Sequence, residues 1–172
     1  MRRGLLGWLS RTPVILCFLV ATLLIGGGFY FVIQEIGGQL LDEIVKGDDA
    51  ISRLNQMDDH QRSVHFWGTV TLDALYPLAY GGLFIGLLSR FGWRWRWGLI
   101  LVPIIGVLAD FAENTVQAMA LSGYAAEVLV AKDIVTPIKF GALLLALALT
   151  VMLGLIALIR NLIRKNNKET PQ

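Results

Sequence analysis

Long apolar stretches alternate with short polar ones along the whole chain. Four of the apolar stretches, near residues 13–34, 64–89, 98–121 and 134–159, are long enough to form helices that cross a bilayer. Crossing takes about 20 residues, and a lone segment in lipid satisfies its backbone hydrogen bonds only as a helix. The pattern therefore predicts an all-α fold, with one polytopic domain over residues 1–172 built as a bundle of four transmembrane helices.

The amino-acid composition is that of a membrane protein. Hydrophobic residues make up 55% of the 172 residues and charged residues only 16%. A soluble domain of this size would need a more polar surface. Cys17 is the only cysteine, so no disulfide can form within the chain.

The polar connections between the spans differ in charge, and the difference predicts the orientation. Basic residues gather before the first span, between the second and third, and in the tail at 160–172. By contrast, residues 35–62 carry seven acidic and three basic residues, and residues 122–133 carry two acidic and one basic. Because basic segments stay inside, we expect both termini in the cytoplasm and the protein in an inner or plasma membrane.

The loop at residues 35–63 is amphipathic, and we expect it to lie outside and to be helical. In its first part the apolar residues fall on one helical face, which predicts an extension of the first span: Ile36, Leu40, Leu41 and Ile44. Gly47 then predicts a break, with an aspartate as the N-cap of a second short helix. At the outer mouth of the bundle, we expect His60 and His65 to be solvated.

The turn "RFGWRWRWG" alternates three tryptophans with arginines. In a membrane protein this pattern is typical of the interface, where tryptophan rings lie at headgroup level and arginines meet anionic lipids. We therefore expect the lipid bilayer, and not a nucleic acid, as the partner of this segment.

Polar residues inside the apolar stretches follow a helical spacing. On the second stretch, Thr69, Asp73, Tyr76 and Tyr80 share one face, and on the third stretch Gly106, Asp110, Glu113, Asn114 and Gln117 do the same. Lys139 stands near the start of the fourth stretch. The residues predicted to form a ligand-binding site are Asp73, Tyr76, Tyr80, Asp110, Glu113, Asn114, Gln117 and Lys139.

The depth of these groups predicts that they meet inside the bundle. At about 1.5 Å of rise per residue, the acidic residues fall in the outer half of the bilayer. The second and third helices should pack as antiparallel neighbours, because a short turn joins them. A charge at the bilayer centre costs about 3 kcal/mol or more, so we expect Lys139 to pair with an acid, or neighbouring carboxylates to share a proton.

Three classes of function fit this cluster. The first, which we favour, is binding or translocation of a cation, a proton or a polar lipid headgroup. Transport would call for a homo-oligomer or a membrane partner, because one short chain has little room for a pathway. The second is an intramembrane enzyme that uses the acids in acid–base work or as metal ligands, with Asp73, Asp110 and Glu113 as candidates. The third is a structural subunit of a membrane complex. No cofactor motif is present, although a divalent cation would suit the acids.

The enzyme class has a precedent in architecture. A four-helix protein with both ends inside and aspartates near the outer face is similar to the lipoprotein signal peptidases. That family carries its acids in N-x2-D-R and N-x-A-D contexts on the last two helices. Here the acids stand in "TLDALYP" and "ADFAENT" on the second and third helices, so the resemblance is one of architecture alone.

Overall fold

The computed structural model describes residues 4–169, and within that range the chain is helical with no strand. Four continuous helical stretches are long and apolar enough to cross a membrane: Thr12–Ile36, Asp59–Phe91, Trp93–Leu121 and Ala126–Lys165. The all-α fold and the four candidate spans are thus confirmed. The second and fourth helices are longer than the apolar stretches that predicted them, because amphipathic turns continue the helix beyond the apolar part.

The first of these helices is a single element, and each of the other three joins several. The first is α2 (Thr12–Ile36), preceded by the short α1 (Leu5–Leu9). The second joins α4 (Asp59–Gly68), the π-helical segment η2 (Thr69–Asp73) and α5 (Ala74–Phe91). The third joins η3 (Trp93–Trp95), α6 (Arg96–Leu99) and α7 (Leu101–Leu121), and the fourth joins η4 (Ala126–Ala131) and α8 (Lys132–Glu169).

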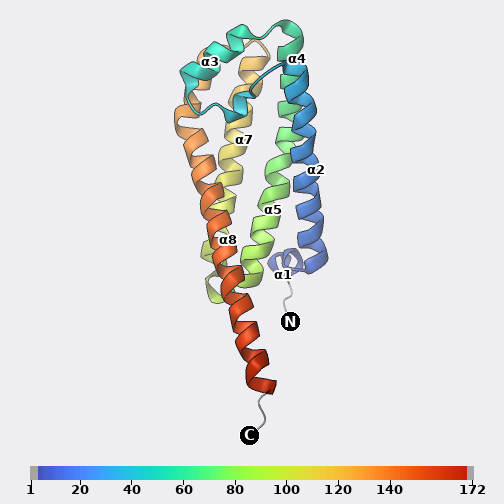
Figure 1. The fold of residues 1–172 in the computed structure, drawn as a ribbon. Helices are drawn as coiled ribbons and strands as arrows, with labels where there is room; N and C mark the ends of the chain where they lie inside the picture. Colours follow the sequence, from blue (N-terminus) through green and yellow to red (C-terminus); the bar gives the residue numbers. More distant parts are fainter. Residues whose placement is uncertain (1–3, 170–172) are drawn as a thin grey trace.

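The central helix of the bundle is α5. It packs against α2 on one side and against α7 and α8 on the other, while α7 and α8 pack along each other. The predicted pairing of the second and third spans is therefore confirmed. Figure 1 shows the N-terminal α1, the turn that follows α5 and the C-terminal part of α8 at one end of the bundle, with α3 and the start of α4 at the other.

Glycines let α1 approach α5 closely and let α2 approach η2 closely. A Cβ added at Gly86 would lie 2.8 Å from the carbonyl oxygen of Leu9, and one added at Gly28 would lie 3.2 Å from the Leu72 side chain. Small residues at helix contacts are the usual way in which membrane helices gain van der Waals contact. Gly28 and Gly86 therefore mark two places where the helices pack closely.

The segment after α2 does not extend that helix, and this expectation is wrong. Gly37 ends α2 with a left-handed backbone (φ 60°). The last carbonyls of α2 are capped from elsewhere, since Arg53 Nη2 and Gln61 Nε2 both donate hydrogen bonds to the Ile36 carbonyl oxygen. The chain then crosses the bundle with only one short helical turn, η1 (Leu41–Glu43).

The second helix of this loop, α3 (Gly47–Gln56), is present but begins differently from the prediction. Lys46 occupies the N-cap position, without a side-chain cap. The Gly47 N–H instead donates to Asp133 Oδ1 at 2.7 Å, so the cap comes from the start of α8. The buried face of α3 carries Ala50 and Leu54, which pack with Leu129 of η4 in one core cluster.

The basic tail that follows the predicted fourth span is helical over most of its length. Helix α8 continues to Glu169, and its last turns project beyond the rest of the bundle (Figure 1). Residues 170–172 lie outside the described part of the chain.

Candidate functional site

The polar residues of the candidate spans face inward, as their helical spacing predicts. Seven of the eight predicted site residues are buried: Asp73, Tyr80, Asp110, Glu113, Asn114, Gln117 and Lys139. The eighth, Tyr76, is half-buried. The charged members form two groups that share Lys139, which we name the Glu113 network and the aspartate trio.

The Glu113 network consists of Glu113, Lys132, Thr136 and Lys139. The Lys132 ammonium pairs with Glu113 Oε1, and the Thr136 hydroxyl donates to the same oxygen. The Lys139 ammonium donates to Glu113 Oε2 at 2.8 Å. Lys132 and Glu113 are both 0% exposed, so this carboxylate is fully enclosed and both of its oxygens are satisfied.

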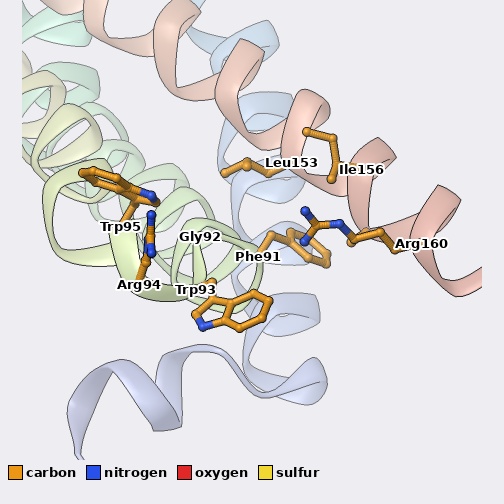
Figure 2. Close-up of a pocket in the computed structure, with 9 residues that line it drawn as sticks. Phe91, Gly92, Trp93, Arg94, Trp95, Leu153, Ile156 and Arg160 are labelled. Carbon is orange, nitrogen blue, oxygen red and sulfur yellow. The ribbon is translucent and has the colours of Figure 1, made fainter.

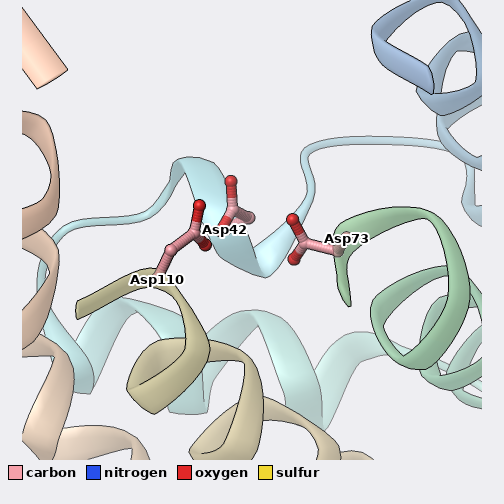
Figure 3. Close-up of side chains that lie close together, drawn as sticks. All are labelled: Asp42, Asp73 and Asp110. Carbon is pink, nitrogen blue, oxygen red and sulfur yellow. The ribbon is translucent and has the colours of Figure 1, made fainter. Parts of the chain in front are cut away.

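The aspartate trio consists of Asp42, Asp73 and Asp110. One carboxylate oxygen from each lies within 4.8 Å of one from each of the others. Figure 3 shows the three side chains pointing toward one another, from η1, from the end of η2 and from α7. Asp42, and not Glu113 as predicted, is the third candidate metal ligand, because Glu113 is turned toward the two lysines.

The three carboxylates of the trio differ in their hydrogen-bond and ion-pair partners. Asp42 pairs with the Lys139 ammonium. Asp110 Oδ2 accepts a hydrogen bond from the Tyr80 hydroxyl at 2.7 Å, while its Oδ1 lies 3.1 Å from Lys139 Nζ without hydrogen-bond geometry. Asp73 as a residue is only 3% exposed, yet among the described side chains its carboxylate has no hydrogen bond or ion pair.

A local irregularity of the helix positions Asp73. In a regular α-helix its carbonyl would accept from the N–H four residues later, but that residue is Pro77, which has none. The Asn114 Nδ2 donates to this carbonyl at 2.9 Å instead. The π-helical turn η2 ends at Asp73 itself, four residues before the proline, and such turns occur frequently at functional sites.

Two amides add unsatisfied polar atoms nearby on α7. Asn114 Oδ1 and both polar atoms of the Gln117 side chain are buried and have no hydrogen-bond partner in the described part of the chain. Gln117 is 0% exposed. Most buried polar atoms in proteins are hydrogen-bonded, so these atoms, together with Asp73, give this side of the cluster spare donor and acceptor capacity.

The charges of the cluster do not balance. Four carboxylates (Asp42, Asp73, Asp110 and Glu113) face two ammonium groups (Lys132 and Lys139). When all are ionised, two negative charges remain without a partner. An uncompensated buried charge is costly, so a cation or protons would stabilise the trio.

Three members of the cluster were not predicted as site residues: Asp42, Lys132 and Thr136. Lys132, Thr136 and Lys139 are spaced i, i+4 and i+7, which is the signal that could have placed Lys132 on the inner face. Asp42 belongs to the crossing loop, and its local sequence contains no sign that it folds back onto the bundle.

His65 also differs from the prediction. It is buried, and its Nε2 accepts a hydrogen bond from the Leu41 N–H at 2.9 Å. Its Nδ1 lies 3.2 Å from the Thr69 hydroxyl. The expectation that this histidine is solvated is wrong, because the crossing loop covers it. His60 is exposed and lies 3.8 Å from Glu35.

A separate cavity of about 460 Å³ lies at the opposite end of the bundle, between the turn after α5 and α8. Figure 2 shows Arg94 and Arg160 among tryptophan, phenylalanine and leucine side chains. It has no carboxylate in its lining. Its lining residues are of the kinds found at a membrane interface, in agreement with the sequence pattern. The cavity shares no lining residue with the aspartate trio.

Comparisons with models of protein families, with curated proteins and with solved structures found no match. The site is therefore interpreted from its geometry alone.

Proposed function

We propose that this multi-pass membrane protein binds a cation at the aspartate trio. One observation carries the proposal: Asp73 is a buried carboxylate that has no partner among the described residues and faces two other carboxylates. A carboxylate held in this way costs free energy unless a ligand compensates it. A binding site has a reason to keep such a group, whereas a purely structural cluster does not.

The donor set supports a hard or ammonium-type cation. The trio offers carboxylate oxygens, and the spare Asn114 Oδ1 is a carbonyl oxygen close to Asp73 in the chain fold. Oxygen ligands of this kind suit Mg²⁺ and Ca²⁺, and they also accept hydrogen bonds from an ammonium group. Because the Lys139 ammonium already contacts Asp42 and Asp110, an entering cation would compete with a built-in one, which favours reversible binding.

We further propose that both termini are cytoplasmic and that the trio lies in the outer half of the membrane. The basic segments gather at one end of the bundle and the acidic α3 region at the other (Figure 1). Single cysteines at Asn55, Ser122 and Asn161, in a Cys17→Ser background, should be tested with a membrane-impermeant maleimide on intact cells. Labelling is expected at the first two positions and not at Asn161, and the reverse pattern would contradict the orientation.

The binding proposal is tested by thermal unfolding of the purified protein in detergent. Mg²⁺, Ca²⁺, Na⁺ and methylammonium are the probes. A ligand that binds only the folded state raises its stability by about 2.7 kcal/mol at a concentration one hundred times Kd. At least one probe should raise the midpoint for the wild type and not for Asp73→Asn.

The matched control is Asp49→Asn, because Asp49 is an exposed carboxylate on α3. This variant should retain the full shift. If every probe acts equally on the wild type and Asp73→Asn, binding is not at the trio, and the cluster is structural.

A further inference from the structure

A groove opens on the bundle surface beside the aspartate trio. It lies between α2 and α8, with α5 as its floor, and has a volume of about 250 Å³. Thr22 of α2, Tyr76, Tyr80 and Phe84 of α5, and Phe140 and Leu144 of α8 line it. These residues all belong to candidate membrane spans, so the groove faces the hydrocarbon region of a bilayer.

The floor of the groove is an aromatic row. Tyr76 packs edge-on against Tyr80 with ring centroids 5.4 Å apart, and Tyr80 lies 6.5 Å from Phe84. Beyond the groove, Phe29 of α2 continues the row at 5.6 Å from Tyr76. Gly26 of α2 faces the Tyr76 ring, and a Cβ added there would be in ordinary van der Waals contact with the ring at 3.6 Å.

Two residues of this groove also contact the charged cluster. The Tyr80 hydroxyl donates to Asp110 Oδ2. The Phe140 ring centroid lies 5.4 Å from Lys139 Nζ, within the range of a cation–π contact. The apolar groove and the aspartate trio are therefore adjoining parts of one site, and a molecule in the groove would have one end next to the carboxylates.

We propose that the ligand of this site is an amphiphilic cation, with its alkyl tail in the groove and its ammonium group at the aspartate trio. This assignment rests on the cation binding proposed above and specifies the class of cation. The two excess negative charges select an ammonium head over a phosphate or a carboxylate. The volume is below the usual range for drug-sized pockets, about 300–1,000 Å³, and suits a single chain.

Other occupants fit the groove less well. A helix of a partner protein is about 10 Å wide with its side chains, which is too bulky for a groove of 250 Å³. A neutral lipid tail would fill the groove but leave the charge excess untouched. A bare metal ion would use the trio and leave the groove without a role.

The test is photolabelling of the full chain in nanodiscs. The probe is dodecylamine with a diazirine at the far end of its tail, and the labelled peptides are identified by mass spectrometry. Labelling is expected at residues 76–84 of α5 and 140–147 of α8. Unmodified dodecylamine should compete and dodecanol should not. In Asp73→Asn, labelling should fall about tenfold, as for the loss of one strong polar contact.

Leu144→Trp tests the groove itself. Leu144 is 68% exposed, so the larger ring should be tolerated while filling the groove. It should remove the labelling but keep the midpoint shift given by the headgroup-sized probes. Leu155→Trp is the matched control, because Leu155 is an exposed leucine on α8 outside this groove, and it should change neither readout.

The outcomes separate this inference from the cation-binding proposal. Labelling that is insensitive to Asp73→Asn, or that dodecanol displaces equally well, would overturn the amphiphile assignment, and a partner segment or ordinary lipid would then fill the groove. If the Asp73-dependent midpoint shift persists in that case, cation binding stands without the tail. If that shift is also absent, both ideas fail.

Discussion

The two halves of the polar cluster are built on opposite principles. In the Glu113 network, a fully buried carboxylate is surrounded by two ammonium groups and a hydroxyl, and both of its oxygens have partners. In the aspartate trio, three carboxylates face one another, and Asp73 has no partner in the described residues. Both halves include acids of α7, and Asp73, Asp110 and Glu113 are all buried, so burial alone does not determine the role of an intramembrane acid. What distinguishes them is whether the chain itself supplies the counter-charge.

The largest loss of unfolding free energy should come from breaking the Glu113 network. Glu113→Gln leaves the fully buried Lys132 ammonium without its carboxylate partner. Removing one member of a buried pair costs about 3 to 5 kcal/mol, so chemical unfolding in detergent should show a loss of that size. The double variant Glu113→Gln with Lys132→Met should recover most of it. A double variant no more stable than the single one would argue against the pair as the cause.

Tyr80→Phe should cause the next largest loss of stability. Tyr80 lies at the boundary between the trio and the groove. The substitution removes the hydroxyl that donates to Asp110, and hydrogen bonds to charged groups are worth about 1.5 to 3 kcal/mol. Tyr76→Phe is the matched control, because no hydrogen bond of the Tyr76 hydroxyl occurs within residues 4–169. Equal stability losses in the two variants, measured by the same unfolding assay, would show that the Asp110 contact is not the reason.

A smaller loss of stability is expected when the hydrogen bond to the Asp73 carbonyl is removed. Asn114→Ala removes the donor to the Asp73 carbonyl, and an unsatisfied buried acceptor costs about 1 to 3 kcal/mol. In a Pro77→Ala background, residue 77 gains an N–H that can serve the same carbonyl. The cost of Asn114→Ala, measured as a double-mutant cycle, should therefore shrink in that background. An unchanged cost would mean that Asn114 acts elsewhere.

Thr115→Ala should hardly change the unfolding free energy, and it serves as the reference for the other variants. The Thr115 hydroxyl is exposed and donates to the Phe111 carbonyl one turn earlier on its own helix. Substitutions away from buried networks usually change stability by no more than about 0.5 kcal/mol. A loss above 1 kcal/mol in the unfolding assay would indicate that polar residues on α7 matter irrespective of the cluster.

The parts of this arrangement that depend on helix periodicity could be predicted from the sequence. The four spans follow from apolar length, and the inward faces of the second and third spans follow from the spacing of Asp73, Tyr80, Asp110 and Glu113. The pairing of Lys139 with the acids was one of two expected outcomes, and the ion pairs agree with it.

The parts that depend on the crossing loop could not be predicted. The apolar side chains between positions 36 and 44 have a helical spacing. The segment nevertheless does not continue the helix, because Gly37 turns the chain. Its path is then fixed by contacts distant in sequence, such as the bond of Gly47 to Asp133. Asp42 reaches the trio only because of this path, so the third carboxylate was counted as a loop charge.

The central claim is that the trio lacks a counter-charge from the chain while the Glu113 network has one. The most direct measurement is the change in unfolding free energy for Asp73→Asn beside Glu113→Gln, in one detergent at neutral pH without added ligand. The account predicts opposite behaviour: Glu113→Gln loses about 3 to 5 kcal/mol, and Asp73→Asn is as stable as the wild type or more stable. A loss for Asp73→Asn as large as that for Glu113→Gln would contradict the account, because it would mean that the Asp73 carboxylate stabilises the fold.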